Sequence, residues 1–337
     1  MTGRALVVEQ PGSVAVVERD ELRPGPGEVV LRPAYCGICG TDLDLLGGNI
    51  DPAFVRYPLT LGHEWSGRVE AVGEGVAGIE PGQRCVAEGL IPCGVCASCL
   101  AGATNVCEVY DEVGFTRAGG AADQILVPAR LVHALDESVS LLDAAVVEPS
   151  AVVLTGLEKV GPEPGMRVLV VGDGTIALLA VLLLAELSQP TELVVAGRRA
   201  EQEELARELG ATGFTVDAPP SGFDLAIEAA GETDAVLTAI GAVRRGGAVL
   251  QLGLPPAGSM LQLPGDLLLN NDLTLAASFG YTSAAWARVV ALLNAGTFRP
   301  GRLVTHTFGL DEFEQAFAEL AEPTGRRGKI VLEVAGG

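Results

Sequence analysis

The chain has 337 residues, 48% of them hydrophobic and only 19% charged, enough to fill two hydrophobic cores and unlike the composition of a disordered protein. Its formal net charge of −21 repels phosphate backbones and excludes nucleic acid as a natural partner. The longest apolar run, Ile176–Ala185, is too short to span a bilayer, and no secretory pattern opens the sequence. We therefore expect a cytoplasmic protein without a membrane partner.

Short β-type runs broken by glycine and proline fill the first part of the chain. They are Ala5–Val8, Val14–Val17, Glu28–Arg32 and Arg68–Val72. Runs of this length, bounded by turn residues, predict an irregular and mostly antiparallel β domain.

Metal-ligand residue types are dispersed between these runs. Cys39 and Asp42 lie in one glycine-flanked segment, His63 and Glu64 follow a glycine, and Glu148 precedes a proline. A cysteine, a histidine and a carboxylate, with water in the fourth position, make a catalytic zinc site. Taken alone each residue has an ordinary explanation, because His63 can be a satisfied core histidine and Glu148 a loop acid.

Four of the seven cysteines form a compact cluster. The spacing is Cys93-x-x-Cys96-x-x-Cys99-x7-Cys107, which suits four thiolates closing a tetrahedral zinc site on one short lobe. No coordination position is left open, so the predicted role is structural. A redox-active cluster and a set of disulfides are the alternatives, and both fit a cytosolic chain less well.

Apolar strands begin to alternate with helices near residue 150. The expected strands are Arg167–Val171, Glu192–Val195, Asp224–Glu228, Ala248–Leu252 and Leu273–Ala277. The expected helices are Ile176–Ala185, Glu201–Leu209 and Thr233–Val243. This alternation predicts a parallel, doubly wound sheet. A helix over Ala284–Asn294 and a β-containing tail ending in Lys329–Val334 complete the chain.

A glycine-rich turn follows the first of these strands. Gly172-Asp173-Gly174-Thr175-Ile176-Ala177 matches the G-x-G-x-x-G/A pattern between a strand and a helix. There the first glycine makes the tight turn, and the second lets the backbone approach a pyrophosphate at the helix N-terminus. The expected cofactor-binding residues are Gly172, Gly174, Thr175, Ile176, Gly197, Arg198, Arg199 and Gly253. An ordinary turn without a ligand is the alternative.

The end of the second strand indicates which dinucleotide binds. NAD sites usually place an acid there, whereas this chain has Gly197 followed by Arg198 and Arg199. Guanidinium groups can hold the 2′-phosphate of NADP, and a carboxylate would repel it. We therefore predict NADP(H) rather than NAD(H), with two solvated surface arginines as the alternative.

These motifs, in register over essentially the whole length, resemble the zinc-containing medium-chain alcohol dehydrogenase family. The resemblance implies a Rossmann dinucleotide-binding domain (residues 150–282) inserted into a mostly β, GroES-like catalytic domain with a zinc lobe (residues 1–149 and 283–337). Glu148, where the ethanol-type branch has cysteine, resembles the polyol, sugar and threonine dehydrogenases.

The resemblance also implies a role for each residue of the dispersed set. Cys39 and His63 would ligate the catalytic zinc, with Glu64 or Glu148 completing the shell. Thr41 would relay the proton of the alcohol, and Asp42 would orient the histidine. Glu64 is placed with these two among the catalytic residues, and Cys36 is treated as a bystander.

The predicted function is hydride transfer between NADP(H) and a secondary alcohol such as a polyol, sugar or cyclitol, in a homodimer or homotetramer with one catalytic and one structural zinc. The alternatives are a threonine or simple alcohol dehydrogenase using NAD(H), a zinc-free reductase of the same fold, and a non-catalytic NADP-binding zinc protein.

Overall fold

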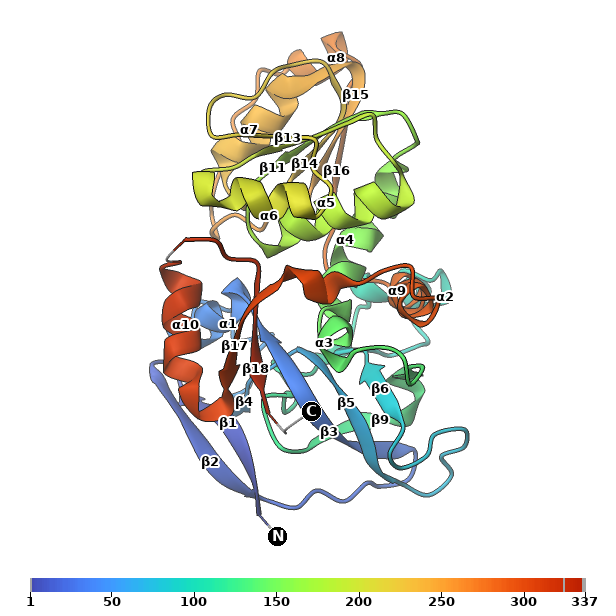
Figure 1. The fold of residues 1–337 in the computed structure, drawn as a ribbon. Coiled ribbons are helices and arrows are strands. Elements are labelled where there is room, and N and C mark those ends of the chain that lie inside the picture. The colour runs from blue at the N-terminus through green and yellow to red at the C-terminus, as the bar shows by residue number, and fades with distance from the viewer. Residues whose placement is uncertain (1, 324, 335–337) are drawn as a thin grey trace. The chain divides into compact units, whose positions relative to one another are not determined.

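Contacts divide the chain into two compact units, each built from more than one segment (Figure 1). The computed structural model describes residues 2–323 and 325–334. Of the described residues, the first unit comprises 2–148, 282–323 and 329–334, and the second comprises 149–281 and 325–328. The segment 325–328 was expected in the first unit. It joins the second because Gln202 bonds both the N–H and the carbonyl of Arg327, and Thr175 bonds the carbonyl of Gly328.

The first unit is built mainly from β-structure. Its strands are β1 (Thr2–Gln10), β2 (Ser13–Asp20), β3 (Glu28–Ile38), β4 (Leu59–Thr60), β5 (Glu64–Val72), β6 (Arg84–Ala87), β7 (Leu90–Pro92), β8 (Tyr110–Glu112), β9 (Ile125–Pro128), β10 (Val132–Ala134), β17 (Val304–Gly309) and β18 (Lys329–Glu333). The largest sheet has the order β10-β6-β5-β3-β18-β17, with β9 also paired to β3. The last strand of the chain thus pairs with a strand from its beginning.

Alternating apolar residues hold this sheet to its core. Val29 and Leu31 of β3 pack with Trp65 and Val69 of β5, and all four side chains are nearly inaccessible to solvent. Each buried aliphatic side chain contributes about 1.5–3 kcal/mol, so this pairing fixes the register of β5. Residues at the start of β5 therefore have defined positions.

Short helices complete the first unit. They are α1 (Gly40–Gly47), α2 (Ala97–Leu100), α3 (Leu141–Ala144), α9 (Ser283–Asn294) and α10 (Phe313–Ala321). Helix α4 (Val147–Val160) begins at the boundary between the units, so Glu148 and Pro149 lie in its first turn rather than in the loop considered as one explanation of Glu148. Proline is tolerated there because the first N–H groups of a helix have no partner within it.

The second unit is a doubly wound parallel sheet, as expected. Its order is β13-β12-β11-β14-β15-β16, and every pairing in it is parallel. The strands are β11 (Arg167–Val171), β12 (Glu192–Ala196), β13 (Gly213–Thr215), β14 (Phe223–Glu228), β15 (Val243–Gln251) and β16 (Thr274–Ala277). The order reverses at β11, which places the turn after β11 at the switch point where doubly wound sheets bind ligands.

Helices cover this sheet on both sides. They are α5 (Thr175–Leu187), α6 (Glu203–Glu208), α7 (Thr233–Ala242) and α8 (Leu267–Asn270), with α5 and α6 over one face in Figure 1. The helix expected over Glu201–Leu209 begins as a 3-10 turn at Ala200–Gln202. Helix α5 buries residues on all sides, which explains why its sequence is apolar without a polar stripe.

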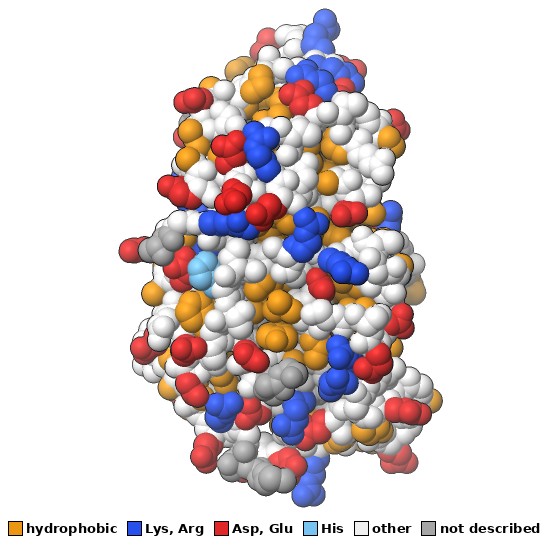
Figure 2. Space-filling view, viewed as in Figure 1, with side chains coloured by type: hydrophobic (Ala, Val, Ile, Leu, Met, Phe, Trp, Pro, Cys, Tyr) orange, Lys and Arg blue, Asp and Glu red, His pale blue; other side chains and the backbone are white. Residues whose placement is uncertain are grey.

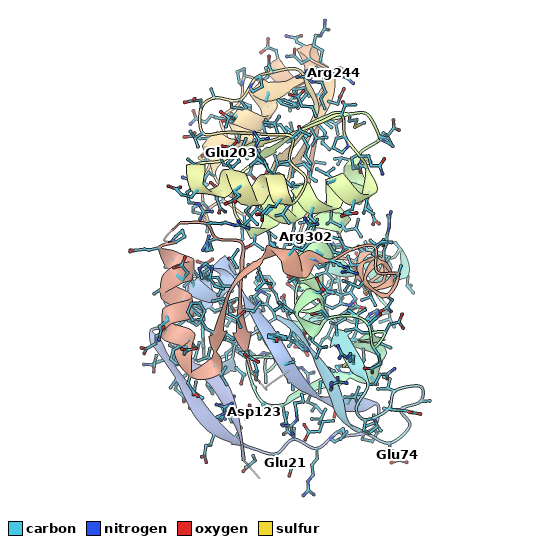
Figure 3. All side chains as sticks on the ribbon, in the orientation of Figure 1. Glu21, Glu74, Asp123, Glu203, Arg244 and Arg302 are labelled. Carbon is cyan, nitrogen blue, oxygen red and sulfur yellow. The ribbon has the colours of Figure 1, made fainter. Side chains whose placement is uncertain are left out.

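Charged side chains of both signs mix on the face drawn in Figure 2. Many have local partners: Arg244, labelled in Figure 3, pairs with Asp224 at 2.6 Å, and Glu203 on α6 pairs with Arg207 at 2.9 Å.

Among the described residues, none of the helices has both the length and the apolar composition that a membrane span requires.

Candidate metal centres and cofactor turn

The four clustered cysteines converge on one point of the first unit. Cys93 and Cys99 place their sulfurs 3.9 Å apart, and Cys96 and Cys107 do the same. Zinc–sulfur bonds of 2.3 Å in a tetrahedron separate sulfurs by about 3.8 Å. The four thiols therefore fit one tetrahedral zinc ion.

Backbone N–H groups prepare some of these thiols for a cation. The N–H groups of Val95 and Cys96 lower the pKa of Cys93, and those of Glu108 and Cys99 lower the pKa of Cys96 to about 6. Burial and the neighbouring thiols raise the pKa of Cys99 to about 12. Zinc binds the thiolate form of cysteine, so a metal ion is the natural charge partner of this cluster.

Three residues of the dispersed set meet where β3 ends and the neighbouring antiparallel strand β5 begins. Cys39 caps α1, His63 ends the loop after β4, and Glu64 opens β5. The Cys39 sulfur lies 3.2 Å from His63 Nε2, and Glu64 Oε1 lies 3.9 Å from the same nitrogen. One ligand atom from each residue lies within 4.8 Å of the other two, so the trio could hold a metal ion.

Asp42 lies on the Nδ1 side of the His63 ring. Its Oδ1 lies 3.6 Å from His63 Nδ1, and its Oδ2 accepts the backbone N–H of Cys39 at 2.9 Å. Both Asp42 Oδ1 and His63 Nδ1 are buried without a hydrogen-bond partner among the described residues. Burial lowers the pKa of His63, but the charges of Cys39 and Asp42 raise it well above its usual value overall. Thr41 lies beside Asp42 in the first turn of α1.

Glu64 has a buried partner that sequence reasoning missed. Lys329 Nζ, from the start of β18, lies 2.6 Å from Glu64 Oε1 and 2.5 Å from Oε2, and both side chains are at most 2% exposed. Gly37 of β3 leaves room for this pair, because a Cβ there would lie 2.2 Å from Glu64 Oε2. Lys329 is one of two lysines in the chain, and nothing in the sequence around it indicates that it pairs with Glu64.

Two further carboxylates lie near the trio, and only one was expected. Glu148 is outside the group that could hold a metal, yet its pKa is raised to about 8 by burial and by the charge of Glu64. Glu112, at the end of β8, was not predicted. Burial raises its pKa to about 7, partly offset by the charge of His63. Phe115, three residues later, packs against His63, with the centroids of the two rings 5.4 Å apart.

Cys36 is fully buried in the main core of the first unit and is not a member of this metal-ligand group, although the charges of Asp42 and Glu64 act on its thiol. Burial raises the pKa of its thiol well above the usual value. Its role as a bystander stays a prediction.

The glycine-rich turn of the second unit lies between β11 and α5. Gly172 has a φ of +123°, a conformation that side-chain-bearing residues rarely adopt, and Ala177 is fully buried. Gly174 caps α5, and Thr175 and Ile176 open it. The N-terminus of a helix of this length is a suitable site for a phosphate.

The loop after β12 holds the two arginines differently. The side chain of Arg198 is 78% exposed, and its nearest acid is Glu232 at 3.7 Å. Arg199 is 22% exposed and pairs with Asp173 of the glycine-rich turn at 2.8 Å. The sequence predicts both arginines as ligands of the 2′-phosphate, but the structure shows that their surroundings differ. Gly253 follows β15 and packs so closely on Gly231 that a Cβ would lie 2.2 Å from its nitrogen.

Comparison with known proteins agrees with this architecture. The alcohol dehydrogenase GroES-like domain model matches residues 25–137, and the glucose dehydrogenase C-terminus model matches residues 143–325. An L-threonine 3-dehydrogenase of Streptomyces avermitilis is 31% identical, with 98% of this chain and 99% of that protein covered. D-arabinitol dehydrogenase 1 of Uromyces fabae is 28% identical, with 94% and 93% covered.

Solved structures extend the likeness to three dimensions. A zinc-binding dehydrogenase of Sinorhizobium meliloti 1021, bound to NADP, superimposes with a TM-score of 0.92 at 30% identity, covering 99% of this chain and 100% of the other. An alcohol dehydrogenase of Escherichia coli CFT073, complexed with NADH, also gives 0.92, at 25% identity and 99% coverage of both chains. The expected family and fold class are confirmed. This chain belongs to the zinc-containing medium-chain alcohol dehydrogenase family and is an NAD(P)-dependent zinc alcohol or polyol dehydrogenase.

Proposed function

We propose that this enzyme oxidises a secondary alcohol of a polyol, sugar or cyclitol with NADP+, or reduces the corresponding ketone with NADPH. The observation that carries the proposal is the convergence of Cys39, His63 and Glu64 beside the further carboxylates Glu148 and Glu112. A thiolate, an imidazole and a carboxylate suit zinc, and carboxylates accept hydrogen bonds from several hydroxyl groups of one substrate.

Cys39 and His63 are the proposed constant ligands of the catalytic zinc. Glu64 is the third ligand when it leaves Lys329, and Glu148 is the alternative third ligand. When bound, zinc supplies Lewis-acid polarisation of the alcohol oxygen. Zinc at Cys93, Cys96, Cys99 and Cys107 is proposed to be structural.

The residues around the trio have distinct proposed tasks. Asp42 Oδ1, 3.6 Å from His63 Nδ1, would accept a hydrogen bond from Nδ1–H in the metal-loaded enzyme and so keep Nε2 directed at the metal position. The Thr41 hydroxyl accepts the proton of the alcohol and passes it towards solvent. Lys329 compensates the charge of Glu64 while that carboxylate is away from the metal. The nicotinamide supplies the hydride acceptor.

NADP(H) is the proposed cofactor. Its pyrophosphate would bind at the glycine-rich turn, to Gly172, Gly174, Thr175 and Ile176. Gly253, which follows β15, would also lie along the cofactor. Gly197 offers no acid to a ribose diol, and Arg198 is exposed and only weakly paired. A structural neighbour bound to NADP supports the proposal, and another complexed with NADH makes NAD(H) the alternative.

Relatives named for D-arabinitol and sorbitol favour a polyhydroxylated substrate. L-threonine is a second candidate because a threonine dehydrogenase is 31% identical. Burial raises the pKa of Glu148 to about 8 and that of Glu112 to about 7, so charge repulsion does not exclude the L-threonine carboxylate, and the two relatives named for polyols carry the preference. We therefore expect neutral polyols to react faster than L-threonine.

One set of assays tests the proposal. Zinc content should be two ions per chain, and a panel of polyols, cyclitols, L-threonine and simple alcohols should be assayed with NADP+ and NAD+. We expect the highest kcat/KM with a polyol or cyclitol and NADP+. Turnover of simple alcohols alone, or of L-threonine with NAD+, would replace this proposal. Light scattering tests the expected homodimer or homotetramer.

A further inference from the structure

Asp173, the residue between the two glycines of the turn, ties the turn to the loop after β12. Its Oδ2 accepts the backbone N–H groups of Arg198 at 2.8 Å and Arg199 at 2.9 Å. Its Oδ1 accepts two N–H groups of the Arg199 guanidinium, Nη2 at 2.8 Å and Nε at 3.2 Å. Since each carboxylate oxygen already accepts two hydrogen bonds, Asp173 has little capacity left for a ribose hydroxyl.

The same contacts use Nε and Nη2 of Arg199, whereas its Nη1 is buried without a hydrogen-bond partner among the described residues. Its Nη2 also donates to the Asp173 carbonyl at 3.0 Å, and that carbonyl accepts Gln202 Nε2 at 2.6 Å. Arg199 therefore holds the two loops together, and its charge is compensated by the carboxylate. Arg198 keeps its guanidinium in solvent, 3.7 Å from a half-exposed Glu232.

Gly197 is glycine because Asp173 fills the space beside it. A Cβ at position 197 would lie 2.9 Å from both Asp173 Cβ and Oδ2, and 2.7 Å from Phe214 Cζ. The acid that many NAD sites carry at the end of the second strand is thus absent from residue 197, but a carboxylate reaches the same loop from residue 173. Of the two arginines that the sequence predicts as phosphate ligands, Arg199 is paired with Asp173, and Arg198 is exposed with Glu232 3.7 Å away.

We propose that Asp173 is a specificity-determining residue for the cofactor. By occupying Arg199 and the N–H groups of residues 198 and 199, it leaves Arg198 as the contact for a 2′-phosphate and limits the preference for NADP(H), so that NAD(H) stays usable. This inference rests on the proposed NADP(H) site and deepens it.

Binding of two nucleotide fragments to the zinc-loaded full chain tests the inference without turnover. The probes are 2′,5′-ADP, which carries the phosphate, and 5′-AMP, which lacks it, with affinities measured by calorimetry. Asp173→Asn keeps the side-chain size and removes the charge, which frees Arg199. We expect 2′,5′-ADP to bind about tenfold more tightly, as one added charge-assisted hydrogen bond would give, and 5′-AMP to change little. An unchanged or weaker affinity for 2′,5′-ADP in a folded Asp173→Asn protein would overturn the inference.

A double variant removes the whole ion pair and separates the two arginines. Asp173→Asn with Arg199→Gln should bind 2′,5′-ADP about as the unmodified protein does, because Arg198 is intact. A tenfold loss there would mean that Arg199 is the phosphate ligand, and the inference would be wrong. Arg198→Gln is the matched control, and its affinity for 2′,5′-ADP should fall about tenfold. If the unmodified protein does not prefer 2′,5′-ADP over 5′-AMP, the NADP(H) proposal fails, whereas the gain in Asp173→Asn still decides the role of Asp173.

Discussion

Each unit of this enzyme holds one expected ligand residue in an internal ion pair, but the two pairs differ in depth. In the first unit Glu64 is bound by Lys329, with both side chains at most 2% exposed. In the second, Arg199 is bound by Asp173 with 22% and 12% of the side chains exposed. The cysteine lobe has no such pair within its metal-ligand group, which consists of thiols alone. A residue whose type suits a metal ion or a phosphate is therefore not necessarily free to bind it. How deeply the ion pair is buried decides how easily the residue is released from its partner.

The largest expected effect comes from removing the catalytic ligands. Cys39→Ser or His63→Ala should lower kcat/KM by about a thousandfold or more, because metal ligation supplies several kcal/mol of transition-state stabilisation and 1.36 kcal/mol is a factor of ten. Binding of 2′,5′-ADP, which uses the other unit, should stay within about twofold. Near-normal turnover in either variant would place the catalytic centre elsewhere.

Breaking the Glu64–Lys329 pair tests the more deeply buried of the two ion pairs. Lys329→Met leaves Glu64 buried without a cation, which should lower the free energy of unfolding by about 3–5 kcal/mol. The control is Lys329→Met combined with Glu64→Gln, which removes both charges and should recover much of that loss in a urea titration. A single variant as stable as the unmodified protein would show that Glu64 does not depend on Lys329.

The cysteine lobe should depend on its metal alone. Cys96→Ser should lower the zinc content by about one ion per chain and the Tm by several degrees, because metal binding there contributes directly to folding. Cys85→Ser is the control for zinc content, since Cys85 is buried in a hydrophobic core and belongs to neither metal-ligand group. Unchanged zinc in Cys96→Ser would argue against a structural ion.

The smallest effect concerns the shallower pair and its pH dependence. Arg199→Gln should cost about 1 kcal/mol of unfolding free energy at pH 7. Burial raises the pKa of Asp173, but the Arg199 guanidinium and the backbone N–H groups lower it below its usual value overall. A lowered folded-state pKa stabilises the protein above the unfolded-state value near 4, and that stability is lost as pH falls through the folded-state value.

The difference in stability between the unmodified protein and Arg199→Gln should therefore shrink below about pH 4. Urea titrations at several pH values measure it. A difference that grew on acidification would contradict the assigned pair.

Local motifs made much of this molecule predictable. The Gly172–Ala177 turn, the strand–helix alternation around it and the spacing of four cysteines are short-range patterns, and the structure places them as expected. The expected link between Cys39 and His63 depended on family resemblance, because the residues are 24 positions apart and pair only through the fold.

The remaining features depend on register and long-range packing. Lys329 reaches Glu64 across 265 positions because β18 pairs with β3 beside β5, and no local pattern encodes that pairing. Glu112 and the Asp173–Arg199 pair were missed for a related reason. From the sequence alone, an acid in a turn or at the end of a strand is expected to be exposed to solvent, and only the fold shows that Glu112 and Asp173 are largely buried.

The pairing of β18 with β3 also has a consequence for biosynthesis. A ribosome makes Glu64 early and Lys329 only after the whole second unit has emerged, so the acid at the metal centre stays uncompensated for most of translation. The second unit, whose main segment is continuous in sequence, can fold while the first still lacks β18, the strand between β3 and β17. A chain truncated before residue 329 would therefore carry a folded nucleotide-binding unit beside an incomplete sheet, a species recognisable to quality-control proteases.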